Sequence, residues 1–311
     1  MMDTPLLLIA WRRPHTLKQV IDAVRPSSPT RVFIACDGPN PDRPGEAEKV
    51  AITRALIEKE IDWPCHIERL YSDVNQGCRL GVSRAISWFF EHVEQGIILE
   101  DDCVPHPDFF HYCITLLEHY KHDTRIWCIS GNNFQDGQWR GDGSYYFSRY
   151  NHCWGWASWR RCWQQYDANL NTWPTLRDSG LLNTIFENPD ERVYWSRIWQ
   201  NLVKMGKPDT WDYQWTFTCL INGGLTALPN RNLVRNVGFG EDATHTIDGE
   251  VNTDVFEGID PSRHPSLLLR DIEADAYTFN NSFGGKWQRF PFVLLKFFKK
   301  GLRFIAKVRS N

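Results

Sequence analysis

The chain has 311 residues, of which 42% are hydrophobic and 23% are charged, a composition typical of a folded globular protein and not of a disordered one. Its formal net charge of -3 at pH 7 argues against a general nucleic-acid binder, which would carry a surplus of basic residues. The 15 tryptophans fit either a heavily packed aromatic core or a surface on which sugar rings stack.

The N-terminal half alternates regularly between predicted strands and helices. Strands are predicted at residues 6–11, 31–36, 65–71, 96–99 and 126–130, and helices at residues 14–24, 46–59, 81–93 and 109–119. This alternation predicts an α/β fold with a doubly wound, Rossmann-like mixed sheet, whose ligands bind beyond the carboxyl ends of the strands.

From about residue 145 the sequence becomes aromatic and rich in loops, with one further helix predicted at residues 194–205. We therefore divide the chain into residues 1–140, residues 141–285 and a tail, residues 286–311. We expect the aromatic-rich part to form a subdomain that packs against the sheet.

The tail combines basic and apolar residues and contains no acid between residues 286 and 309. On a helix, one face would carry Lys296, Lys299, Lys300, Arg303 and Lys307, with the apolar residues on the remaining arc. A basic amphipathic helix of this kind is typical of proteins that bind an anionic membrane surface. The alternative is a terminal helix that docks on the protein itself and leaves its basic face in solvent.

The cysteines and the N-terminus indicate the compartment. The nine cysteines are scattered without a CxxC pair, which fits neither a zinc site nor a disulfide framework and predicts reduced thiols in the cytoplasm. The apolar run at residues 6–10 is too short for a signal peptide or a membrane span. Together with the tail, this predicts a cytoplasmic protein held peripherally on the inner face of a membrane.

The predicted strand at residues 96–99 ends on three consecutive acids, Glu100, Asp101 and Asp102. Three partly buried carboxylates repel one another unless a positive charge joins them. Mn²⁺ or Mg²⁺, which prefer oxygen ligands, would provide that charge. The alternative is an acidic turn in solvent.

Several short segments accompany the acidic run in a fixed order. They are Asn75-Gln-Gly-Cys-Arg79, Pro107-Asp-Phe-Phe110, Cys128-Ile-Ser-Gly-Asn-Asn133, Gly155-Trp156, Trp211-Asp-Tyr-Gln-Trp215 and the stretch from Gly240 to His245. With the Glu-Asp-Asp triplet, this order resembles nucleotide-sugar glycosyltransferases of the GT-A superfamily, and most closely the N-acetylglucosaminyltransferase I-like family. The resemblance covers about residues 5–250.

The resemblance implies a role for each position. Residues 1–140 would bind the nucleotide sugar through Asp37, Arg79, Glu100 and Asp101, and residues 141–285 would bind the acceptor through Gly155, Trp156 and Trp211. The metal would be held by Asp102 and His245, and Asp212 would be the general base that takes the proton of the acceptor hydroxyl.

Each of these positions also has a plain structural interpretation. Asp37 could be a turn residue before Gly38, Asp212 and Arg79 could cap helices, and His245 could lie on the surface. The chain also lacks the N-terminal membrane span of the eukaryotic family members, so the family's acceptor and its N-acetylglucosamine donor do not carry over directly.

The sequence thus predicts a metal-dependent inverting glycosyltransferase. It would move a sugar from a UDP-sugar such as UDP-N-acetylglucosamine onto a glycan or lipid-linked acceptor in surface polysaccharide or glycolipid synthesis. The alternatives are a non-catalytic carbohydrate-binding protein and a sugar-phosphate nucleotidylyltransferase. The latter would need a glycine-rich loop after the first strand, where residues 10–14 contain no glycine.

Overall fold

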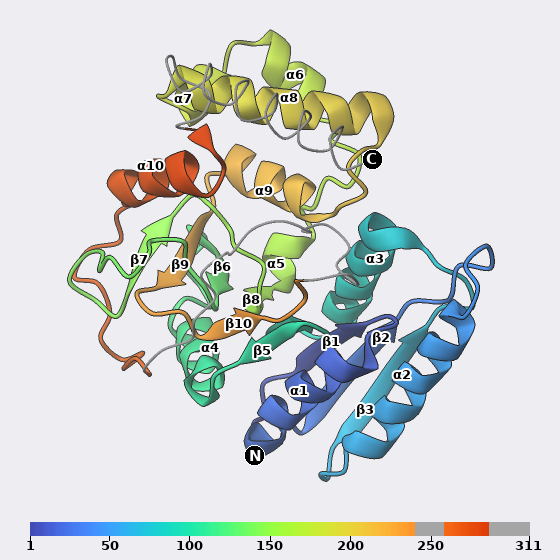
Figure 1. The fold of residues 1–311 in the computed structure, drawn as a ribbon. Helices are drawn as coiled ribbons and strands as arrows, with labels where there is room; N and C mark the ends of the chain where they lie inside the picture. Colours follow the sequence, from blue (N-terminus) through green and yellow to red (C-terminus); the bar gives the residue numbers. More distant parts are fainter. Residues whose placement is uncertain (240–257, 286–311) are drawn as a thin grey trace, which may run out of the picture.

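The computed structural model describes residues 1–239 and 258–285 of the chain. Its centre is an eight-stranded sheet in the order β3-β2-β1-β4-β8-β6-β9-β7 (Figure 1). The strands are β1 (Leu6–Ala10), β2 (Arg31–Cys36), β3 (His66–Tyr71), β4 (Gln95–Glu100), β6 (Ile126–Ser130), β7 (Tyr145–Ser148), β8 (Trp156–Trp159) and β9 (Leu225–Pro229). All five strands predicted from the sequence are therefore confirmed within a few residues.

The sheet is mixed, as expected. The pairings of β1 with β2 and β4, of β2 with β3 and of β6 with β9 are parallel, whereas β8 runs antiparallel between β4 and β6, and β7 is antiparallel to β9. The carboxyl ends of β1–β4, β6 and β9 consequently meet at one edge of the sheet, together with the start of β8.

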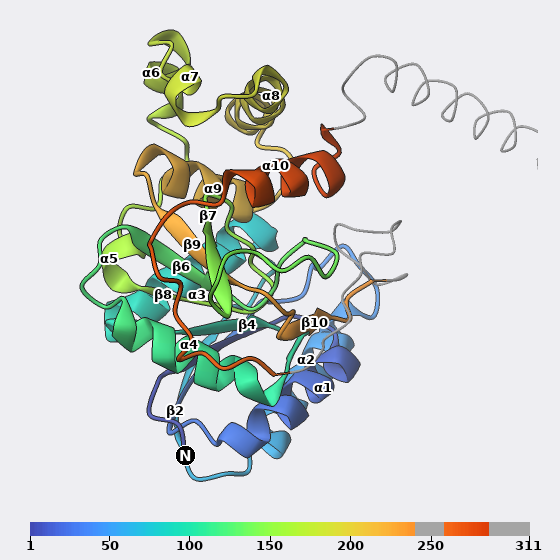
Figure 2. The same cartoon turned by 90° about the vertical axis from the view of Figure 1, so that its left-hand side faces the viewer.

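Helices cover both faces of the sheet, which makes it doubly wound. Helices α1 (Pro14–Val24) and α2 (Glu46–Glu60) pack side by side on one face, and α3 (Gly77–His92) lies on the other, as right-handed crossovers require (Figures 1 and 2). Helix α4 (Pro107–His119) packs against β4, β6 and β8. The four helices predicted in this half are confirmed.

Helix α3 begins four residues before the predicted start. The backbone N–H groups of its first turn are bonded by side-chain oxygens of other segments, so the helix extends back to Gly77. Such long-range caps are invisible in the local sequence pattern.

The second half adds helices around the far part of the sheet. They are α5 (Arg160–Trp163), α6 (Trp173–Asp178), α7 (Leu182–Ile185), α8 (Pro189–Met205), α9 (Asp212–Ile221) and α10 (Ile272–Asn281). Figure 2 shows α6, α7 and α8 as a layer beyond α9 and α10. A two-stranded ribbon of β5 (Cys103–Pro105) and β10 (Val234–Asn236) crosses beside β4.

The aromatic residues of this half build a second core. Nine of the tryptophans that the structure describes are buried, and five of them, Trp156, Trp173, Trp195, Trp199 and Trp215, are among the largest fully buried side chains. Trp173, Trp195 and Trp199 pack with Tyr150 and Phe217 in a cluster separate from the main core. The high tryptophan content is thus largely a packing feature, and only a minority of the rings remain for ligands.

None of the nine cysteines forms a disulfide. Within residues 1–239 and 258–285, no helix has the length and apolar character needed to cross a bilayer. The predicted amphipathic tail lies outside the described residues. Strands from both sides of residue 140 join one sheet. The division of the chain at residue 140 therefore stays a prediction about which part binds the donor and which binds the acceptor.

Candidate active site

A cleft of about 1140 Å³ runs along the carboxyl edge of the sheet. Its walls include Ser72 after β3, Asp37 after β2, Trp11 after β1, Trp154 before β8 and Asn230 after β9. At about 4.8 Å per strand, the five steps from β2 to β9 span about 24 Å. The cleft is therefore long enough for two ligands placed end to end.

The acidic run lies at the middle of this edge, at the end of β4. Asp101 is buried, accepts a hydrogen bond from the backbone N–H of Trp11 (3.2 Å) and forms an ion pair with Arg13. These contacts fix the turn between β1 and α1 to the end of β4. Burial raises the pKa of Asp101, although Arg13 opposes the shift.

Arg13 also contacts the last acid of the run. Its Nη1 lies 2.8 Å from Oδ2 of Asp102, whose side chain is 14% exposed. Gly238 closes over this pair, because a Cβ there would lie 2.1 Å from Asp102 Oδ2 and 2.8 Å from Arg13 Nη1. Arg13 is thus a positive partner of the triplet that the sequence analysis did not anticipate.

Glu100 is the third acid and faces the same cleft. Burial, followed by the negative charges of Asp102 and Asp101, raises the pKa of Glu100 to about 8. The surroundings therefore disfavour the ionised form of Glu100. An additional cation would favour its ionisation.

Asp37 lies between β2 and the start of α3. Its carboxylate accepts hydrogen bonds from the backbone N–H groups of Gly38 (2.8 Å) and Gln76 (2.9 Å) and from the side chain of Asn75 (3.0 Å). Burial raises the pKa of Asp37, and these bonds limit the rise. Asp37 therefore stabilises the turn before Gly38 and also lines the cleft, so both interpretations of this residue remain compatible with its position.

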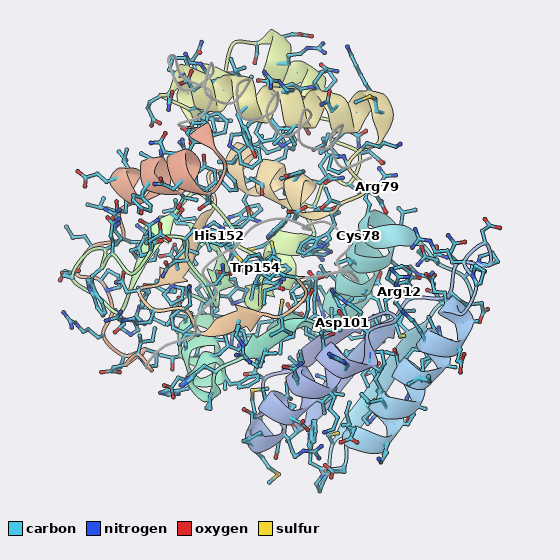
Figure 3. All side chains as sticks on the ribbon, viewed as in Figure 1. Arg12, Cys78, Arg79, Asp101, His152 and Trp154 are labelled. Carbon is cyan, nitrogen blue, oxygen red and sulfur yellow. The ribbon has the colours of Figure 1, made fainter. Side chains whose placement is uncertain are left out.

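The first turn of α3 is capped by Asp209, which precedes α9. The Asp209 carboxylate accepts hydrogen bonds from the backbone N–H groups of Cys78 (2.9 Å) and Arg79 (3.2 Å). Figure 3 shows Cys78 and Arg79 at this end of α3, with Asp101 below them and Trp154 and His152 further along the sheet. Arg84, one and a half turns later, lines the cleft, whereas Arg79 is not among the lining residues.

Asp212 is the first residue of α9 and lines the cleft. Thr210 donates a short hydrogen bond from its hydroxyl to Oδ1 of Asp212. The negative charge of Asp212 makes a minor contribution to the raised pKa of Glu100, and both residues line the cleft. The N-terminus of α9 stabilises a negative charge at this position.

The part of the cleft beyond β4 is lined by aromatic rings. Trp154 packs edge-to-face against Phe134 (ring centroids 5.3 Å apart) and Phe239 (5.8 Å). All three line the cleft, together with Asn133 and Asn232. Flat rings bordered by amide groups are suited to a saccharide.

The three residues predicted to bind the acceptor lie differently in the structure. Trp156 is fully buried in β8 and stacks on Trp211 at 5.7 Å, and Trp211 itself is 3% exposed. Gly155 has a φ of 64° and leads the chain from Trp154 into β8. The prediction for Trp156 is corrected, because a ring enclosed in the core cannot contact a ligand, and the half-buried Trp154 two residues earlier is the ring that lines the cleft.

Only one of the two residues predicted to bind the metal lies in the described part of the chain. Among the described residues, no group of three His, Cys, Asp or Glu side chains is arranged as a metal site. His245, the second predicted ligand, lies outside the described residues. Asp102 is in the cleft wall with its carboxylate accessible, as the prediction requires of a ligand.

Four site residues were missed in the sequence: Arg13, Arg84, Trp154 and Asp209. A signal existed for Trp154, which stands beside the Gly155-Trp156 pair, and for Arg13, which directly follows the first strand. Arg84 and Asp209 carry no such signal, because only the packing of α3 against the loop before α9 brings them to the cleft.

Comparisons with known proteins reach only remote structures. No protein-family model and no curated protein sequence matches the chain. Among solved structures, a galactosyltransferase, LgtC, in complex with donor and acceptor sugar analogs has a TM-score of 0.37 at 13% identity, covering 72% of both chains. An active-site mutant of LgtC has a TM-score of 0.40 at 12% identity, covering 91% of this chain and 99% of that one. A 4-diphosphocytidyl-2C-methyl-D-erythritol synthase from Anaerococcus prevotii has a TM-score of 0.35 at 13% identity, covering 60% and 85%. At this level of similarity none of them assigns an activity to the chain.

Proposed function

We propose that the protein is a glycosyltransferase of the GT-A type, related to the N-acetylglucosaminyltransferase I-like family, that transfers a sugar from a nucleotide-diphosphate donor to an acceptor hydroxyl. One observation carries the proposal. A single cleft is lined by both the acidic run of β4 and Asp212 of α9, with a polar end on one side and an aromatic, amide-lined end on the other.

The donor would occupy the end of the cleft beside β2 and β3. Asp37 and Asn40 offer hydrogen-bonding groups for a nucleoside, and Arg84 offers a positive charge for phosphate. A UDP-sugar, such as UDP-N-acetylglucosamine, is the donor that we favour. Arg79 remains a candidate for donor binding only through its backbone, and its N–H already donates a hydrogen bond to Asp209.

A diphosphate in this cleft needs additional positive charge. The lining residues include seven acids but only five arginines, and Arg13 is already paired with two of the acids. The carboxylate oxygens of Asp102 and Glu100 suit Mn²⁺ or Mg²⁺, which commonly bind one or two carboxylates together with phosphate oxygens. Such an ion would neutralise charge on the departing diphosphate. Asp102 would hold it directly, and Asp101, held by Arg13 and Trp11, would keep the end of β4 in place.

Asp212 would act as the general base. It would accept the proton of the acceptor hydroxyl while the hydroxyl oxygen attacks the anomeric carbon and the bond to the diphosphate breaks. A direct displacement of this kind inverts the anomeric configuration. Thr210 would orient the Asp212 carboxylate through its hydrogen bond.

The acceptor would lie at the aromatic end, with a sugar ring on Trp154. We propose a glycan or lipid-linked acceptor of surface polysaccharide or glycolipid synthesis. The two alternative functions leave features without a role. A carbohydrate-binding protein has no use for the acidic run, and a nucleotidylyltransferase would need a glycine-rich turn after the first strand, where residues 10–14 of this chain contain no glycine.

Ligand binding distinguishes these functions. Calorimetric titration of the full chain with UDP, UDP-sugars, UTP with a sugar 1-phosphate, and neutral glycans, each with and without Mn²⁺, tests the donor assignment. The proposal predicts metal-dependent binding of UDP and UDP-sugars. Binding of glycans alone would favour the carbohydrate-binding alternative, and formation of pyrophosphate from UTP would favour the nucleotidylyltransferase.

A further inference from the structure

The arginines of the cleft differ in their partners. Arg12 and Arg43 lie 2.8 Å and 3.7 Å from the same acid, Glu46, and Arg13 is paired with the acidic run. Within residues 1–239 and 258–285, neither Arg84 nor Arg231 has a carboxylate partner. Arg84 belongs to the donor end through α3. Arg231 follows β9, at the opposite end, where the proposed donor does not reach.

Arg231 is held in a fixed turn by its two neighbours. Asn230 is 2% exposed, and its side chain accepts from the backbone N–H of Arg140 and donates to the carbonyl of the same residue, both at 2.8 Å. Asn232 accepts a hydrogen bond from the backbone N–H of Asn133 at 2.7 Å. The backbone on both sides of Arg231 is therefore anchored, and Arg231 is one of the residues that line the cleft.

A second arginine and an exposed tryptophan lie beside it. The guanidinium carbon of Arg231 is 6.0 Å from the ring centroid of Trp139, and that of Arg263 is 5.9 Å from the same ring. Trp139 is 44% exposed, an unusual state among the tryptophans of this chain. Arg263 is fixed by donation of its Nε–H to the carbonyl of Asp142 at 3.0 Å. Two like charges that converge on one exposed ring repel each other, and an anion between or beside them would relieve the repulsion.

Nearby acids neutralise only part of this charge. Asp142 is close enough for Arg263 to contribute to its lowered pKa, after the hydrogen bonds from Ser266. Asp136, which also lines the cleft, accepts a hydrogen bond from the hydroxyl of Tyr277 at 2.7 Å. Arg231 has neither of these acids as an ion-pair partner, so its charge is available to a ligand.

The position of Arg231 along the sheet indicates which ligand its charge would bind. Three strand steps separate β9 from β4, or about 14 Å, with Trp154 and Phe134 between them in the cleft wall. We propose that Arg231, supported by Trp139 and Arg263, binds an anionic group of the acceptor, a carboxylate or a phosphate, at a distance from the hydroxyl that reacts. The inference rests on the proposed function, because that function places the acceptor at this end of the cleft. It deepens that function by assigning a negatively charged acceptor class.

Calorimetry on the full chain, with UDP and Mn²⁺ present to fill the donor end, tests the proposal. The probes are methyl β-glucoside as the neutral reference, methyl β-glucuronide for a carboxylate and glucose 6-phosphate for a phosphate. The wild type should bind at least one anionic probe about tenfold more tightly than the neutral one, as expected for one charge-assisted contact. Which anionic probe gains affinity distinguishes a carboxylate-bearing from a phosphate-bearing acceptor.

Two variants separate the role of Arg231 from general electrostatics. Arg231→Gln should abolish the preference for the anionic probe and leave the neutral probe unchanged. Arg235→Gln, which removes an exposed arginine of β10 outside the cleft lining, is the matched control and should retain the preference. Equal affinities for neutral and anionic probes in the wild type, no measurable binding of any anionic probe, or equal losses in both variants would overturn the proposal. The titration with UDP alone reports on the proposed function separately, because failure to bind UDP leaves the anion preference of Arg231 measurable.

Discussion

At the scale of single residues, the proposed chemistry depends on Asp212 and the acidic run, which line the same cleft. Asp212→Asn keeps the size and hydrogen bonding of the side chain but removes the proton acceptor. We expect UDP affinity to be retained while turnover falls about 10²–10⁴-fold. Calorimetry with UDP and a turnover assay on the same preparation measure both quantities. Loss of UDP binding with an unchanged rate per bound complex would assign Asp212 to the donor instead.

His152 makes a second prediction at this scale, about stability. The residue is buried, its Nε2 has no hydrogen-bond partner in the described structure, and its ring packs against Phe134 at 4.5 Å. Burial lowers the pKa of His152 to about 3. Between pH 6.5 and pH 3 the unfolded chain therefore binds a proton that the folded chain does not, and stability falls as the pH decreases.

His152→Phe should remove this contribution while keeping a ring against Phe134. Between pH 6.5 and pH 5 the wild type should lose about 1.5 kcal/mol more of its free energy of unfolding than the variant does. Urea unfolding at a series of pH values provides the comparison. Parallel stability curves for the two proteins would show that His152 is protonated in the folded state.

At the scale of secondary-structure elements, the strands and helices with a clear hydrophobic pattern were predicted from the sequence. Strands β1, β2 and β4 are short apolar runs, and α1 shows its helical spacing in Leu17, Val20, Ile21 and Val24. The antiparallel insertion of β8 between β4 and β6 was not predicted, because the register of Trp156 with Ile98 and Ser130 depends on pairings across the whole sheet.

The same distinction holds for the site. Asp102 and Asp212 were identified from their sequence context, whereas Asp209 and Arg84 reach the cleft only through tertiary packing. Trp156 was assigned to the acceptor because sequence spacing does not distinguish a ring in the core from its half-buried neighbour Trp154. Trp154 lies in the loop before β8 and Trp156 is the first residue of that strand, whose start was not predicted.

The ion pair that joins α8 to the residue after β7 can be tested by substitution. Arg149, after β7, forms a buried two-pronged ion pair with Glu191 of α8, at 2.6 Å and 2.5 Å, and Tyr150 also bonds to Glu191. Glu191→Ala leaves the buried Arg149 with only its longer ion pairs to Glu187 (3.4 Å) and Asp275 (3.8 Å), and should lower the free energy of unfolding by about 3 kcal/mol. Replacing both residues by methionine should cost less than the single change. Urea unfolding of the three variants measures this, and additive losses would show that the pair is not energetically coupled.

At the scale of the whole molecule, the tail at residues 286–311 remains the predicted membrane contact. Five basic residues on one helix face, at about 1 kcal/mol each near an anionic surface, would hold the protein on a cytoplasmic membrane beside a lipid-linked acceptor. Truncation after Gly285 should abolish sedimentation with anionic liposomes and leave the melting temperature unchanged. Raising the salt concentration should weaken the binding of the full chain, because screening shortens the reach of the charges. A large drop in melting temperature on truncation would support the docked-helix alternative.

In the proposed reaction, the cleft transfers a sugar from a nucleotide diphosphate with the help of a metal bound at Asp102. Release of free UDP, measured together with formation of the glycosidic product across a panel of UDP-sugars, tests it most directly. We predict one UDP per glycosidic bond in the presence of Mn²⁺, loss of turnover in EDTA, and a rate about a thousandfold lower in Asp102→Ala with UDP-sugar binding weakened and the fold intact. Turnover that persists in EDTA-treated protein, or a near wild-type rate in Asp102→Ala, would exclude a metal at Asp102 as part of the reaction.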